Sequence, residues 1–195
     1  MNQSSDQATR YDTVTIWLHW ATALLVVEQW VGAKTIDMWE GPLRIDARSV
    51  HIALGISLGF IVLFRMVWRA TQGKALPNAD TGLLGLVAKA MHWGLYALVI
   101  AIVGLGVALL AMRGDSIFGL FQFPVLVQAA RPLRHTVQDL HETLATIVLI
   151  AAGLHAAAAL FHRYVLKDGV LARMWPARAP VEPTIREINV GRTVP

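Results

Sequence analysis

The sequence predicts an all-α integral membrane protein, a bundle of four transmembrane helices with both termini in the cytoplasm. Three observations lead to this fold class. Hydrophobic residues make up 55% of the 195 residues and charged residues 15%, which is too apolar for a water-soluble core of this size. Four apolar stretches are each long enough to cross a hydrocarbon layer of about 30 Å. Lysine and arginine are unevenly divided between the two sides that these stretches define.

The four predicted spans cover roughly Thr13 to Ala33, Val50 to Trp68, Leu86 to Met112 and Leu140 to Leu166. The polar residues before the first span lack the short apolar core and small-residue cleavage site of a signal peptide, so we expect this helix to remain in the mature protein. Before the fourth span, Asp139 is followed three residues later by Glu142, the pattern of a helix N-cap and its reciprocal partner. We therefore expect the fourth helix to begin there, with His141 in its first turn.

The segments between and after the spans are richer in polar residues, glycine and proline. Residues 71–85 contain Gly73, Pro77 and Asn78, which is typical of a loop, and residues 114–138 are long enough to form a small lid on the outer face. Beyond Trp175 the chain carries several prolines and charges of both signs. We therefore predict a transmembrane domain over residues 1–176 and a loosely ordered cytoplasmic tail over residues 177–195.

The orientation follows from the basic residues near the ends of the spans. The side of the termini carries Arg10, Arg65, Arg69, Lys74, Lys89, Arg163, Lys167, Arg173, Arg178, Arg186 and Arg192. The other side carries the smaller set Lys34, Arg44, Arg48, Arg113, Arg131 and Arg134. The positive-inside rule therefore predicts cytoplasmic termini. The formal charge of +4 fits basic residues at membrane ends, and we expect no nucleic acid partner.

Histidines recur within the apolar stretches, where an ionisable side chain costs a few kcal/mol and marks a candidate functional position. His141 and His155 are about four helical turns apart, so they project from nearly the same face, about 21 Å apart along the axis. Between them this face carries Ala145, Val148 and Ala152. Small side chains there leave room for a large, flat group beside the helix.

Other spans supply histidines at matching depths. His51 lies near the outer end of the second span, level with His141, and Gly55 one turn below it leaves room for a ring. His19 lies near the inner end of the first span, level with His155, because the first and fourth helices run in opposite directions. Two opposed pairs are the arrangement that ligates two b-type haems through imidazole on both axial sides. The absence of cysteine excludes thiolate metal sites, iron–sulfur clusters and covalently attached haem.

The remaining histidines leave alternatives open. His92 and His162 lie on the cytoplasmic side, where we expect a quinone or proton-handling site rather than structural hydrogen bonding, although either could replace His19 or His155 as a ligand. His135 is expected to be an ordinary surface residue. A haem-free transporter or proton channel, in which the histidines form a relay, is a further possibility.

Several motifs resemble the bacterial cytochrome b561 family of four-helix, di-haem membrane cytochromes. These motifs are WLHW, SVHIALGIS, MHWGLYALVI, LHETLA and GLHAAAALFHRYVLKDGVLARMWP. The resemblance covers roughly Tyr11 to Pro176, is strongest over the fourth helix, and implies a multi-pass protein of the bacterial inner membrane. Matched residue by residue, it implies that His19, His51, His141 and His155 bind the two haem irons.

The resemblance also implies a superoxide oxidase, which passes electrons from superoxide on the outer face through the haems to ubiquinone. The candidate quinone neighbours are then His162, His92, Lys74 and Lys89. An alternative is a haem-bearing subunit that accepts electrons from a dehydrogenase or a periplasmic redox partner. The outer segments contain Arg44, Arg48, Arg113, Arg131 and Arg134. These arginines could attract anionic superoxide, or they could bind haem propionates and lipid headgroups.

Overall fold

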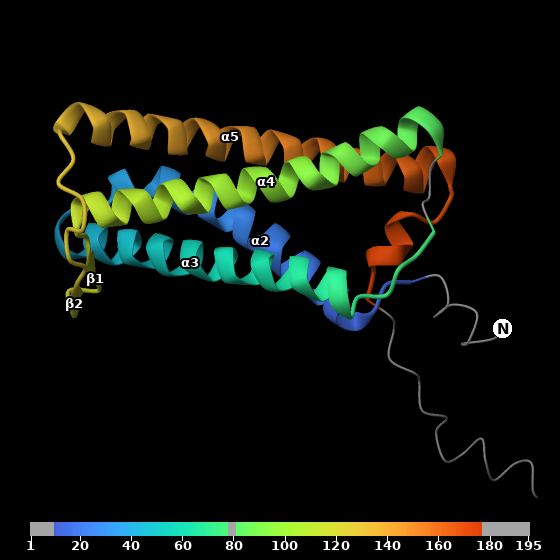
Figure 1. Cartoon of the computed structure of the whole chain (residues 1–195), viewed down its shortest axis with the longest axis horizontal. Coiled ribbons are helices and arrows are strands. Elements are labelled where there is room, and N and C mark those ends of the chain that lie inside the picture. The colour runs from blue at the N-terminus through green and yellow to red at the C-terminus, as the bar shows by residue number, and fades with distance from the viewer. Residues whose placement is uncertain (1–9, 78–80, 177–195) are drawn as a thin grey trace, which may run out of the picture.

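The computed structural model describes residues 10–77 and 81–176, and its four long helices form one elongated bundle (Figure 1). The helices are α2 (Thr13–Thr35), α3 (Gly41–Thr71), α4 (Gly82–Arg113) and α5 (Arg131–Phe161). Short elements complete it: η1 (Ile36–Met38), β1 (Ser116–Ile117), β2 (Phe121–Gln122), the π-helix η2 (His162–Leu166) and η3 (Leu171–Met174). Four helical segments, with mean hydropathy from 1.2 to 2.6, are long and apolar enough to cross a membrane, which confirms the predicted all-α bundle of four membrane-spanning helices.

Successive helices run in opposite directions, so the bundle has two distinct ends (Figure 1). We call the end with β1 and β2 the hairpin end, and the end with Arg10 and Pro176 the termini end. The backbone N–H of Tyr11 donates to the carbonyl of Arg173 at 3.1 Å, which ties the two described chain ends together. A chain that crosses the bundle four times begins and ends at the same end.

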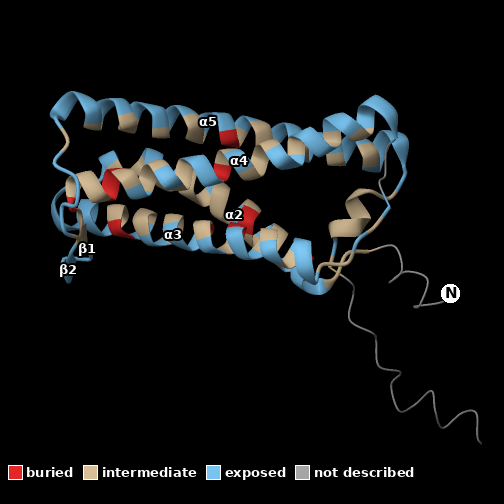
Figure 2. Ribbon diagram, viewed as in Figure 1, coloured by how far each residue is buried: buried red, intermediate tan, exposed pale blue. Residues whose placement is uncertain are grey.

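The buried core is thin and central. Leu58, Val62, Val99 and Val148 form its cluster of buried residues, whereas most of the ribbon is exposed or intermediate (Figure 2). In the most apolar stretch of each membrane-spanning segment, only 6–17% of the residues are buried inside the protein. Lipid chains are as apolar as leucine, so the outward-facing side chains of a membrane bundle need no protein cover.

The fourth helix begins earlier than the sequence predicts. It starts at Arg131 with proline in its first turn, and the residue that precedes it is Ala130 rather than Asp139. Glu142 does not cap the helix; its Oε1 accepts a hydrogen bond from Gln138 Nε2 at 2.8 Å, one turn back. His141 therefore lies about three turns into α5. The prediction of a capping box was wrong because these polar residues continue the helix instead of starting it.

The second and third helices also begin before their apolar stretches, at Gly41 and Gly82. Hydropathy marks the part of a helix that crosses lipid, while the polar turns beyond it are still helical. The predicted lid is accordingly shorter, because residues 131–138 belong to α5. Its remainder contains the hairpin, where Ser116 pairs with Gln122 and the N–H of Phe118 donates to Ser49 Oγ at 2.8 Å. The predicted tail over residues 177–195 lies outside the described residues.

Asp12 joins three segments at the termini end. Its carboxylate caps α2 by accepting from the N–H and the hydroxyl of Thr15, at 2.9 and 2.7 Å. It also accepts from Trp68 Nε1 at the end of α3 and from the N–H of Lys74, both at 3.0 Å. Burial raises the pKa of Asp12, but these hydrogen bonds outweigh it and hold the pKa well below its usual range.

We expect Asp12→Ala to lower the free energy of unfolding at pH 7 by about 1–2 kcal/mol, since loss of a helix cap alone costs about 0.5–2 kcal/mol. Because the folded pKa is depressed, the stabilisation is full above the unfolded pKa of about 3.9 and is lost as pH falls below it. Thermal unfolding of both proteins in detergent at pH 7 and pH 3 tests this. Asp139→Ala, at an exposed position within α5, is the control. Equal stability of the Asp12 variant and wild type at pH 7 would contradict the role of Asp12.

Candidate functional site

At the hairpin end, His51 of α3 and His141 of α5 face each other. Their ring centroids are 6.4 Å apart and the ring planes differ by 72°. Among the described residues, the buried Nδ1 of His51 has no hydrogen-bond partner. Two imidazoles on opposite sides of one metal ion, with bonds of about 2.0–2.1 Å, have ring centroids roughly 6 Å apart. The spacing of this pair therefore fits an iron between the rings.

At the termini end, His19 of α2 and His155 of α5 form a second facing pair. Their ring centroids are 6.1 Å apart and the planes differ by 74°. The structure thus brings together both pairs that the depth argument predicted. His92 of α4 lies closer still to His155, with ring centroids 5.2 Å apart. Arg65 of α3 completes this group, because its Nη2 is 3.0 Å from His19 Nδ1.

The hairpin-end pair lines a cavity of about 470 Å³, within the range of about 300–1,000 Å³ typical of cofactor sites. Its walls are largely apolar and include Ile52, Leu58, Ile102, Val103, Val107, Leu109 and Leu110. Three arginines also line it: Arg44, Arg48 and Arg113. Arg48 lies 3.3 Å from Asp115 and Arg44 lies 2.5 Å from Asp37. An apolar cavity with cationic side chains suits a flat apolar ring that carries carboxylates.

Two glycines shape this cavity. A Cβ on Gly106 of α4 would lie 3.3 Å from His141 Cε1, so the absence of a side chain there gives His141 its position. A Cβ on Gly55 would lie 2.6 Å from Gln29 Nε2, which donates to the carbonyl of His51 at 2.9 Å. The space predicted above Gly55 for a ring is therefore shared with Gln29. Sequence reasoning missed both Gln29 and Gly106, although an amide in a membrane span is a signal that could have found Gln29.

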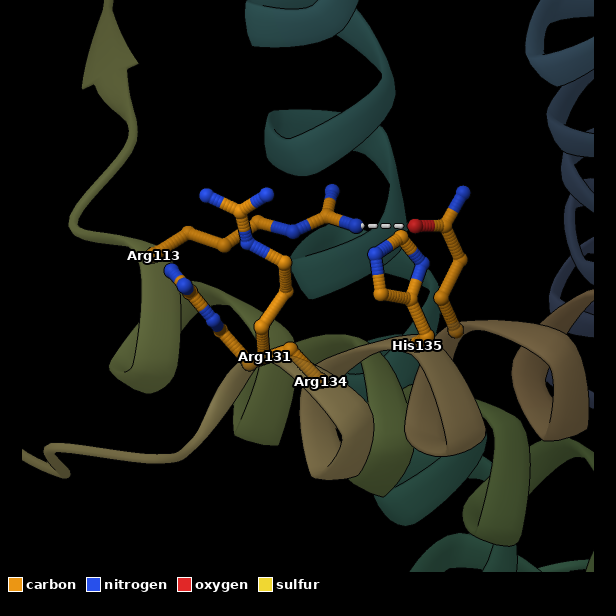
Figure 3. A pocket seen from close by; sticks show the side chains of 5 residues that line it. Arg113, Arg131, Arg134 and His135 are labelled. Carbon is orange, nitrogen blue, oxygen red and sulfur yellow. Dashed lines mark hydrogen bonds between the residues drawn. The ribbon is translucent and has the colours of Figure 1, made fainter.

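A second, basic cavity of about 240 Å³ adjoins the first at the hairpin end, and Figure 3 shows the side chains that line it. It is lined by Arg113, Arg131, Arg134, His135 and Gln138, and it shares Arg113 and Gln138 with the larger cavity. We call these five residues the basic pocket. Arg113 Nη2 donates to Gln138 Oε1 at 2.5 Å, which holds one guanidinium in place. His135, which we expected to be an ordinary surface residue, is exposed and also belongs to this pocket.

The predicted quinone neighbours occupy different surroundings at the termini end. His92 contacts the ring of His155, and Lys89 is exposed on α4. The backbone N–H of Lys74 binds Asp12. His162 does not continue α5, which ends at Phe161; it begins the wider π-helical turn η2, with its Nδ1 2.5 Å from Asp168 Oδ2. The hydrogen bond from His162 lowers the pKa of Asp168.

The chain is similar to known proteins over most of its length. Residues 10–177 match the family model described as prokaryotic cytochrome b561. A protein named "Probable superoxide oxidase CybB" from Yersinia pestis is 33% identical over 173 residues, which cover 87% of this chain and 97% of that protein. "Cytochrome b561 homolog 1" from Escherichia coli (strain K12) is 30% identical over 175 residues, covering 87% and 98%. "Cytochrome b562" from Cereibacter sphaeroides is 28% identical over 178 residues, covering 88% and 99%. The similarity therefore extends over all four helices.

Proposed function

Because this chain belongs to the prokaryotic cytochrome b561 family, whose members are membrane electron-transfer proteins with haem b, we propose that it carries two haems. His51 and His141 would hold one, and His19 and His155 the other. The observation that carries this proposal is the pair of facing imidazoles at each end, with centroid spacings of 6.4 and 6.1 Å. The one-site alternative, with haem at the hairpin end alone, leaves the second pair without a role.

When bound, such haems would accept and pass on one electron at a time. The residues of the chain would hold the haem, exclude water and supply charge. The imidazoles would hold the iron, and the apolar cavity walls would keep water away from it. Arg113, which lines the hairpin-end cavity, would supply positive charge for the haem carboxylates, whereas Arg44 and Arg48 are already paired with Asp37 and Asp115. Because α5 contributes one histidine to each pair, it connects the two sites along a single rigid element.

We further propose that superoxide donates electrons at the hairpin end and that ubiquinone accepts them at the termini end. The basic pocket supports an anionic donor, because it gathers three arginines beside the histidine cavity. The name of the Yersinia pestis relative supports the same donor. The quinone would bind near His92, His162, Lys74 or Lys89. The basic-residue pattern supports cytoplasmic termini in the bacterial inner membrane.

A superoxide pulse in a stopped-flow instrument tests this assignment. We expect the oxidised haems to be reduced faster than superoxide decays spontaneously, and added ubiquinone to reoxidise them. Haem reduction no faster than that decay would exclude superoxide and favour the second candidate, a haem-b subunit that receives electrons from a dehydrogenase or a periplasmic redox protein. The exposed arginines of the hairpin end also suit an acidic protein partner.

Gly106 offers a test of the hairpin-end site alone. A valine at this position would push against His141, and overpacking of this kind costs about 1–3 kcal/mol. We therefore expect Gly106→Val to weaken haem retention at this site by roughly tenfold or more, since about 1.4 kcal/mol is tenfold. Gly104→Val is the matched control, because a Cβ at Gly104 of the same helix meets nothing within 4 Å. The haem-to-protein ratio after size-exclusion chromatography measures the effect, and equal ratios in both variants would contradict it.

A further inference from the structure

Arg65 is a cation within a membrane span that has no acidic partner. It lies in α3, and in the described part of the chain no carboxylate is within ion-pair distance of it. Its Nε is buried without a hydrogen-bond partner among these residues, and its guanidinium carbon lies 5.4 Å from the ring centroid of Tyr96. The face of a tyrosine attracts a cation but does not neutralise it. An arginine in a membrane span costs a few kcal/mol of insertion free energy unless an anion pairs with it. Arg65 therefore lacks the anion that would offset this cost.

The contact between Arg65 and His19 restricts the state of the histidine. A guanidinium carries only N–H donors, so His19 Nδ1 must accept the hydrogen bond at 3.0 Å. In a neutral ring the proton then sits on Nε2, which leaves no lone pair there for a metal. A histidine that binds iron through Nε2 instead keeps its proton on Nδ1 and donates it. The observed contact and iron binding through Nε2 therefore exclude each other.

A haem carboxylate is the anion that fits this position. Arg65 lies six residues before the end of α3, which places it about 9 Å from the helix end and level with the rings of His19 and His155. The other side chains of the group, His92 and Tyr96, carry no negative charge at neutral pH. Arginine binds a carboxylate through two parallel N–H bonds, which is stronger than a single bond to an imidazole. A haem held by His19 and His155 would supply carboxylates at this end of the bundle, where Arg65 contacts His19.

We propose that Arg65 is the carboxylate-binding residue of the haem at the termini end. The guanidinium that contacts His19 Nδ1 at 3.0 Å would bind the haem carboxylate instead, and this exchange would leave His19 free to bind the iron through Nε2. This inference rests on the proposed two-haem function. The positive charge of Arg65 would also affect the reduction equilibrium of this haem. Ferric haem carries one more positive charge than ferrous haem, so a nearby cation favours the reduced form.

The first test is the midpoint potential of each haem, measured by redox titration of the absorption spectrum. We expect Arg65→Gln to shift the reduction equilibrium of one haem about tenfold toward the oxidised form, which is about 59 mV for one electron. Arg65→Lys keeps the charge and should shift it less. Arg69→Gln, one turn along α3 and stacked on Tyr11 with 4.6 Å between its guanidinium carbon and the ring centroid, should shift either potential less than Arg65→Gln does. Unchanged potentials in Arg65→Gln, with two haems bound, would overturn the proposal.

The second test uses haem whose carboxylates are methyl esters. A His141→Ala chain, purified without haem, offers only the termini-end site. We expect it to bind the diester at least tenfold more weakly than haem, whereas a chain that also carries Arg65→Gln should bind the two forms equally. Equal binding by the chain with Arg65 intact would overturn the inference, even if Arg65→Gln fails to fold. A His141→Ala chain that binds no haem, beside a wild type that binds one, would instead overturn the proposed second site.

Discussion

The change His141→Ala is expected to remove one of two haems and leave the other in place. His141 is the α5 member of the hairpin-end pair, and without it His51 faces an empty space across the cavity. The termini-end pair is about 21 Å away along α5, because His141 and His155 are about four turns apart. A loss at one end therefore leaves the other pair intact. His135→Ala, on the same helix but outside both pairs, should retain both haems.

The pyridine haemochrome assay gives the haem count per chain, and the low-temperature absorption spectrum shows which haem remains. His155→Ala should give the complementary loss. His92→Ala should retain both haems, although the His92 ring is nearer to His155 than the His19 ring is. Loss of a haem from His92→Ala with full occupancy in His19→Ala would make His92 the ligand. Loss of both haems from every single variant, with the chain still folded, would argue against two separate sites.

Much of the fold could be predicted because hydropathy alone identifies membrane-spanning helices. A continuous run of about 20 apolar residues fits a helix that crosses the bilayer and is too long for one strand of a membrane β-barrel, so the four spans follow from the sequence. The boundaries could not be predicted in this way, because Arg131–Gln138 are helical outside the apolar stretch. The Asp139 and Glu142 pattern has the spacing of a cap, but the same spacing also occurs inside a helix. Only the continuation of α5 upstream decides between the two.

The site was predictable to the extent that the depth of each histidine in the membrane determines which histidine of a neighbouring helix it faces. Antiparallel helices of known span place His19 beside His155 and His51 beside His141. The matching family model confirms the family resemblance, while the assignment of these histidines as haem ligands stays a prediction. The depth of a residue in the membrane does not determine how its helix is rotated about the helix axis. The contact of Arg65 with His19, and the space that Gly106 leaves for His141, depend on this rotation. Arg65 and Gly106 can therefore be identified as site residues only from the packed arrangement of the helices.

Reduction of the haems by superoxide is expected to slow as salt is added, and to slow further when Arg131 and Arg134 are both replaced by Gln. Both arginines line the basic pocket (Figure 3). No carboxylate in the described chain lies within ion-pair distance of either. A positive pocket raises the encounter rate of an anion by about 10- to 1,000-fold. Neutralising two of its three arginines should therefore lower the second-order rate constant by about tenfold at low salt.

The salt dependence separates steering from other effects of the substitutions. The Debye length falls from about 30 Å at 0.01 M salt to about 3 Å at 1 M, so the rate constants of wild type and the double variant should converge as salt rises. A variant with Arg163→Gln and Lys167→Gln removes the same charge at the termini end and should match wild type throughout. A difference that persists undiminished at 1 M would mean that Arg131 and Arg134 act through structure. A double variant as fast as wild type at low salt would remove the basic pocket from the path of superoxide.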